Sequence, residues 1–96
     1  MAARVFEKEM GITHRDFFRL LPMALGTDKF STTIDSASLK AGMKSVEIEL
    51  GPESSRRIAL LVIPTTPVTL TLDGYSDSEA EIFMATFERA YQRGGG

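Results

Sequence analysis

The chain has 96 residues, no cysteine, and 13 acidic against 11 basic side chains, for a formal net charge of −2. This length predicts a single domain over residues 1–96. The missing cysteines exclude disulfides and thiolate metal sites, and the acidic balance disfavours both sequence-independent nucleic-acid binding and docking on anionic lipid.

The first ten residues, MAARVFEKEM, lack the apolar run of a secretory signal, and no window approaches 18 apolar residues that could span a membrane. We therefore expect a cytoplasmic protein with no membrane contact. Residues 1–10 predict an N-terminal arm that is either flexible or docked as a short edge segment, and Phe6 is the residue that favours docking.

A first helix is predicted to begin after Thr13. The Thr13 side chain can cap the helix, and Asp16 can complete a shortened capping box. Ile12 and Phe17 are spaced as the two ends of a hydrophobic staple. Pro22 lacks a backbone donor, so we expect the helix to kink or stop near Leu21, and Gly26 should close the element.

Two strands follow, with a polar connection between them. Residues 30–35 alternate weakly between apolar and polar side chains, and residues 36–42 are interpreted as a wandering connection. Residues 45–50 alternate cleanly, so their glutamates should face solvent. Residues 51–55, GPESS, predict a turn.

The stretch from Arg56 to Gly74, RRIALLVIPTTPVTLTLDG, is predicted to organise the fold as two strands. The first, residues 58–63, is apolar at every position, which is typical of a strand covered on both faces. Pro64 and Pro67 are expected to separate the strands, since neither can donate to a ladder. The second, residues 68–72, alternates with threonine and should be half-buried.

A second helix is predicted from Ser76 to about Gln92. Ser76 and Glu79 have the spacing of a full capping box, and charges at both ends complement the helix dipole. Residues 94–96, three glycines, predict a flexible tail. The apolar face of the helix consists of Ala80, Phe83, Met84, Phe87, Ala90 and Tyr91.

Together these elements predict an α+β fold in the order α-β-β-β-β-α, with a four-stranded antiparallel meander and both helices packed on one face. The aromatic side chains of the helices are interpreted as core rather than as a base-stacking platform. The covered face of the sheet would include Ile58, Leu60 and Val62.

The sequence offers no identifiable catalytic constellation, so we expect a non-enzyme without cofactor or metal. His14, the single histidine, is interpreted as an exposed first-turn residue. Asp35, Glu47 and Glu49 could hold a hard cation, but a solubilising outer face is the commoner explanation of this pattern. Residues 51–57 combine hydroxyls with paired arginines but lack the glycines, lysine and following helix of a phosphate loop.

Six arginines are candidate anion-binding positions. If the helices are adjacent, these side chains could rim a groove that binds a small carboxylate or phosphate ligand. A solvated helix face is the alternative interpretation. The residues are Arg15, Arg19, Arg56, Arg57, Arg89 and Arg93.

The second apolar face of the central strand provides the leading functional hypothesis. An apolar stripe rimmed by polar residues is typical of an interaction surface. We expect a small accessory module that binds another protein or, as a homodimer, itself. The alternative hypothesis is binding of a small anionic ligand in the arginine-rimmed groove. The candidate interaction surface consists of Ala59, Leu61, Ile63, Thr69 and Thr71.

Overall fold

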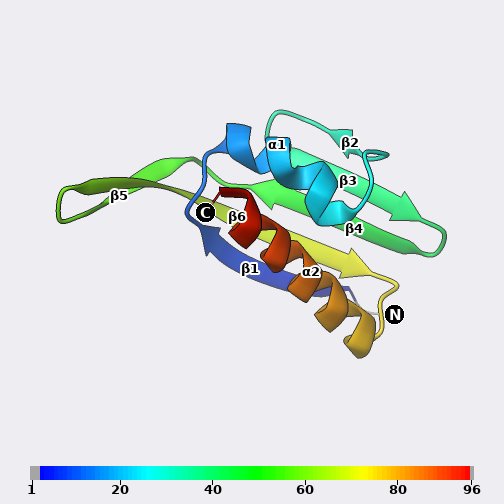
Figure 1. Cartoon of the computed structure of the whole chain (residues 1–96). Helices are drawn as coiled ribbons and strands as arrows, with labels where there is room; N and C mark the ends of the chain where they lie inside the picture. Colours follow the sequence, from blue (N-terminus) through cyan, green and yellow to red (C-terminus); the bar gives the residue numbers. More distant parts are fainter. Residues whose placement is uncertain (1–2, 96) are drawn as a thin grey trace.

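The computed structural model describes the backbone of residues 3–95 and the side chains of residues 3–92. Two helices, α1 (His14–Leu25) and α2 (Asp77–Gly95), lie on one face of an antiparallel six-stranded sheet (Figure 1). The predicted α+β class is confirmed, although the sheet has more strands than expected. The strands are β1 (Arg4–Met10), β2 (Ser31–Thr32), β3 (Ser36–Ala41), β4 (Lys44–Leu50), β5 (Ser54–Ile58) and β6 (Leu61–Asp73).

The long strand β6 connects the parts of the sheet. The strand order is β1-β6-β4-β3-β2, and β5 pairs with β6 outside that path. Residues 4–10 form an edge strand along Thr66–Leu72 of β6, with Phe6 opposite the fully buried Leu70. Phe6 therefore packs on the helix-covered side, and β1 widens the sheet without covering its outer face.

The core lies between the sheet and the two helices. The Phe17 and Tyr91 rings stack with centroids 5.1 Å apart, and Tyr91 Oη donates a 2.7 Å hydrogen bond to the Phe17 carbonyl. Burial raises the pKa of Tyr91. The interpretation of the helix aromatics as core is thus confirmed. The buried apolar residues are Phe17, Leu20, Leu21, Ala24, Ala37, Val46, Ile48, Leu50, Val68, Leu70, Leu72, Ala80, Met84, Phe87, Ala90 and Tyr91.

The predicted helix starts are confirmed, and Gly26 closes the first helix as predicted, in a left-handed conformation with a φ of 72°. Thr13 Oγ1 accepts a 3.1 Å hydrogen bond from the Asp16 backbone. A stop near Leu21 does not occur, since the helix continues past Pro22 to Leu25 and buries Ala24 in the core. α2 runs through Gly95, into the predicted flexible tail, and Gly96 lies outside the described residues.

The interpretation of residues 36–42 as a wandering connection is wrong, because residues 36–41 form β3. A two-residue loop, Gly42–Met43, joins β3 to β4, and the φ of 64° at Gly42 is the left-handed conformation that such a hairpin loop requires. Only Ala37 of β3 is buried, so the strand carries little apolar pattern. The weak strand at 30–35 shortens to β2, and Ile34 is exposed.

The doubly covered strand predicted at residues 58–63 is also wrong. The chain reverses at Ala59–Leu60, and β6 then continues through both prolines. The Pro67 carbonyl accepts a 2.8 Å hydrogen bond from Gly51 N. The nitrogen of Pro67 points to the same side, where the regular pairing of β4 with β6 has already ended. The missing N–H of Pro67 therefore removes no hydrogen bond from the sheet. Ile58, Leu60 and Val62, expected beneath the helices, are instead exposed.

None of the helices within residues 3–95 is long and apolar enough to cross a membrane.

Candidate functional site

Residues 54–65 form a two-stranded hairpin that extends away from the rest of the molecule (Figure 1). This projecting hairpin contains β5, the Ala59–Leu60 loop and the first five residues of β6. It gives the molecule principal extents of 46 × 24 × 23 Å. A two-stranded hairpin without further cover is marginally stable in water, so its position requires explanation.

The tip of the projecting hairpin exposes consecutive aliphatic side chains. Leu60 is 97% exposed and Leu61 65% exposed, and Ile58 and Val62 are also at least half exposed. A contiguous group of exposed apolar side chains is typical of contact surfaces. The tip is therefore the strongest candidate functional feature of the described residues.

A β-bulge separates the projecting hairpin from the main sheet. Leu50 pairs with Val68 and Ser54 pairs with Thr65, so three residues of one strand oppose two of the other. β4 and β5 thus form one interrupted side of a long hairpin whose other side is β6. A bulge bends the strand and increases its twist, which redirects residues 54–65 out of the sheet.

The N-terminus of α1 holds this bulge. His14 Nε2 lies 2.8 Å from the Gly51 carbonyl, and because a carbonyl only accepts, this ring nitrogen carries a proton. The His14 backbone N donates to Glu53 Oε1 at 2.8 Å, which places a carboxylate at the positive end of the helix. His14, expected to be an exposed residue, is in fact half-buried and fixes the base of the projecting hairpin.

The predicted interaction residues divide between two environments. Leu61, Ile63, Thr69 and Thr71 share one face of β6, while Ala59 lies in the loop with a φ of 54°. Only the two threonines lie in the main sheet. The outer face around them is mostly polar, because three of their four strand neighbours are glutamates (Glu7, Glu47 and Glu49) and only Val5 is apolar.

Sequence reasoning missed Leu60 and Val62 as surface residues because it assigned them to the covered face. The composition of residues 54–65 is the feature of the sequence that could have indicated an exposed hairpin. Arg56 and Arg57 precede an unbroken apolar run, and the segment contains no carboxylate. Such a run fits an exposed basic and apolar tip as well as it fits a buried strand.

The candidate anion-binding arginines show no common groove in the structure. Arg19 pairs with Asp16 at 3.3 Å and Arg56 pairs with Glu9 at 2.6 Å. Arg15, Arg57 and Arg89 are exposed on three different elements, and the side chain of Arg93 lies outside the described residues.

A groove of about 350 Å³ does lie beside the end of α2, but none of the five candidate arginines with described side chains lines it. Lys8 and Glu88 in the groove neutralise each other at 2.6 Å. Gly11 is at the groove and also next to the projecting hairpin, since a Cβ on Gly11 would lie 3.5 Å from Ile63 Cγ2. The groove is lined by Lys8, Met10, Gly11, Ile12, Glu88, Tyr91 and Gln92.

The candidate cation ligands Asp35, Glu47 and Glu49 border one hollow of about 340 Å³ together with Ser36 and Leu50. Among the described residues, however, no three histidine, cysteine or carboxylate side chains converge closely enough to hold a metal ion.

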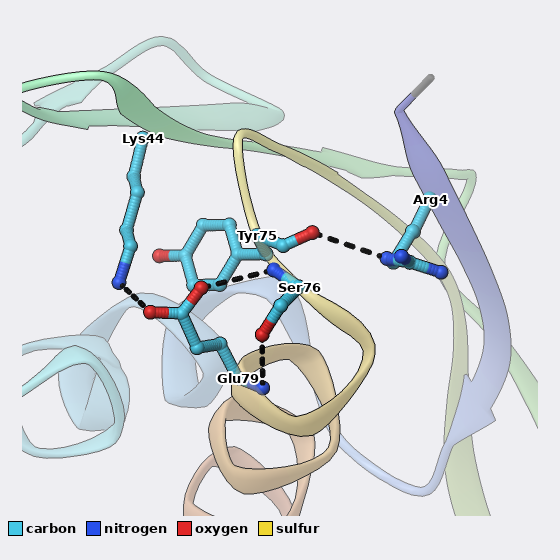
Figure 2. Close-up of polar contacts among 5 residues, drawn as sticks. All are labelled: Arg4, Lys44, Tyr75, Ser76 and Glu79. Atoms are coloured by element: carbon cyan, nitrogen blue, oxygen red, sulfur yellow. Dashed lines mark hydrogen bonds and ion pairs between the residues drawn. The ribbon is translucent and has the colours of Figure 1, made fainter. Parts of the chain in front are cut away.

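A polar cluster closes the end of β6 opposite the projecting hairpin (Figure 2). Lys44 Nζ donates to Glu79 Oε2 at 2.6 Å, and Ser76 N donates to Glu79 Oε1 at 2.9 Å. These hydrogen bonds hold the pKa of Glu79 at about 2. Arg4 Nε donates to the Tyr75 carbonyl at 3.3 Å. The cluster joins β1, β4 and the start of α2, and its groups satisfy one another, so its role is structural.

Comparison with known proteins gives no relative: the chain matches no protein-family model, no curated protein and no solved structure.

Proposed function

We propose that this protein is a small, non-catalytic interaction module that contacts a protein partner through the tip of the projecting hairpin. The observation that supports this most directly is the 97% exposure of Leu60 beside Leu61, which is 65% exposed. The partner is a second copy of the chain or another protein. A cytoplasmic location is part of the proposal and is supported by the absence of cysteine.

The energetic argument rests on what burial of the tip would gain. Full burial of an aliphatic side chain contributes about 1.5–3 kcal/mol, and four such side chains are available at residues 58, 60, 61 and 62. Contact with a partner would also order a hairpin that has little support of its own. Arg57 is exposed and pairs with Val62, next to the Ile58–Leu61 pair that flanks the loop. An ion pair between Arg57 and a carboxylate of the partner could orient the partner.

The test compares two exposed aliphatic positions in matched variants. Leu61→Glu places a charge in the tip, whereas Ile82→Glu places one on the exposed side of α2, at a residue of equal exposure (65% and 67%). Protein contacts in cell extract and in the pure sample are mapped by cross-linking. We expect Leu61→Glu to fold normally and lose the contacts that the Ile82→Glu variant retains. If both variants keep the same contacts, the proposal is wrong.

A further inference from the structure

We propose that the partner is a second copy of this chain, bound with the two projecting hairpins antiparallel so that each tip occupies the groove at the base of the other. This inference rests on the proposed function and names its partner. Both halves of the contact are present on one chain, which is the condition for an isologous two-fold interface.

The tip and the groove are complementary in character. The tip is aliphatic, with Leu60 almost fully exposed, and the groove presents Met10 and Ile12 in a volume of about 350 Å³. Its open volume suits one or two aliphatic side chains, since even sites for whole small molecules begin near this size. Filling it would cover apolar surface on both copies.

Their spacing allows both contacts to form at once. The groove lies at the base of the projecting hairpin, because Gly11 lines it and approaches Ile63. The end of α2 is also close to this base (Figure 1). Tip and base are about 20 Å apart at roughly 3.3 Å per strand residue. When two hairpins lie antiparallel over this length, each tip reaches the other base.

Charge favours the same arrangement. The projecting hairpin carries Arg56 and Arg57 and no carboxylate. Since the whole chain has a net charge of −2 and the hairpin contributes +2, the remainder carries −4. A basic hairpin that lies against the acidic remainder of a second copy is favoured by opposite charge.

The hairpin edges are poorly suited to the alternative, in which strands of two copies pair directly. An antiparallel pairing of β5 with its copy, centred on Arg56, would bring the arginines of the two chains together, and like charges opposite each other are unfavourable. Pro64 removes a backbone donor from the other strand of the hairpin. Side-chain packing of tip against groove is therefore the better contact.

Engineered cysteines test this geometry, because the natural chain has none. The double variant Leu60→Cys/Gln92→Cys places one thiol at the tip and one at the groove. Within one chain these sites are separated by about the length of the hairpin, beyond the ~7 Å limit for a disulfide. We expect mild oxidation to yield a covalent dimer from the double variant and from neither single variant. Light scattering over a concentration range measures wild-type association in parallel.

Three outcomes would overturn the inference. Efficient cross-linking of Leu60→Cys alone would show that the tips meet each other. A wild-type dimer whose double variant does not cross-link would show a different interface. A wild-type monomer at every concentration would exclude the second copy. In that last case, binding of another protein that Leu61→Glu abolishes would leave the proposed function intact, so the two failures are distinguishable.

Discussion

The two halves of β6 have similar sequences and opposite environments. Residues 66–73 lie between β1 and β4, and Val68, Leu70 and Leu72 are at most 1% exposed. Residues 61–65 are richer in aliphatic side chains, with three in five residues against three in eight, yet only β5 pairs with them and Leu61 and Val62 are exposed. The same strand is therefore core at one end and surface at the other.

This difference shows that the burial of a β6 side chain depends on whether a helix lies over that part of the strand. At about 1.5 Å per residue, the 19 residues of α2 extend ~28 Å. The eight residues of the inner half of β6 span ~26 Å at about 3.3 Å each. α2 thus matches the inner half in length, while α1 begins at the bulge and packs beside α2 on the same face. No described helix extends over the outer half.

The largest expected effect comes from truncating leucine in each half. Leu70→Ala removes a fully buried side chain and should lower the free energy of unfolding by about 2–5 kcal/mol. Leu61→Ala removes an exposed one and should change it by less than about 0.5 kcal/mol. Urea unfolding of dilute samples, where self-association is minimal, measures both. Similar losses in the two variants would contradict the division of β6 into core and surface halves.

The next effect concerns the turn that ends the buried half. Gly74 has a φ of 82°, and an added Cβ would lie 2.3 Å from the Met43 carbonyl oxygen. Gly74→Ala should therefore lower the free energy of unfolding by about 1–3 kcal/mol through backbone strain, and by a further amount through the clash. Gly42→Ala is the matched control, since it has a positive φ but no atom within 4 Å. The Tm of Gly74→Ala should be clearly lower than the Tm of Gly42→Ala. Equal decreases in Tm would contradict the clash.

Local patterns were sufficient to predict much of the inner half. The alternation in residues 45–50 and 68–72 and the capping boxes at Thr13 and Ser76 depend on near neighbours in sequence. The two helices and two strands that they predicted are present, and their apolar faces form the core.

The projecting hairpin could not be predicted in this way. Ala59 and Leu60 form a reversal without the glycine or asparagine that normally marks one, so RRIALLVI reads as a single strand. The bulge at 51–53 depends on a clamp from His14, 37 residues away from Gly51 in sequence. The groove that we propose as the binding site for the tip also could not be predicted from the sequence, because Ile12 and Tyr91 come together only in the folded chain.

A pH-dependent change in folding stability should arise only at the end of β6 that belongs to its buried half, where Glu79 pairs with Lys44. Glu79→Gln keeps the capping geometry but removes the charge that pairs with Lys44. Because folding lowers the pKa of Glu79 from 4.5 to about 2, its contribution is complete above pH 4.5 and is lost as pH falls toward 2. The stability difference between wild type and Glu79→Gln should shrink over that range. Glu81→Gln, an exposed neighbour on α2, is the control. A difference that persists unchanged at pH 2 would contradict the role of the Glu79 charge.

The smallest expected effect lies in the projecting hairpin itself. Ala59 has a φ of 54°, and this conformation costs an L-residue about 1–2 kcal/mol, whereas glycine adopts it freely. Ala59→Gly should relieve that strain, partly offset by the ~0.5–1 kcal/mol entropic cost of glycine. Amide hydrogen exchange in residues 54–65 should slow a few-fold, while exchange in β1 and β4 should not change, since the hairpin opens locally. If amides in β1 and β4 slow by the same factor, both halves of β6 open as one unit, and their separation into a stable core half and a locally ordered contact half is wrong.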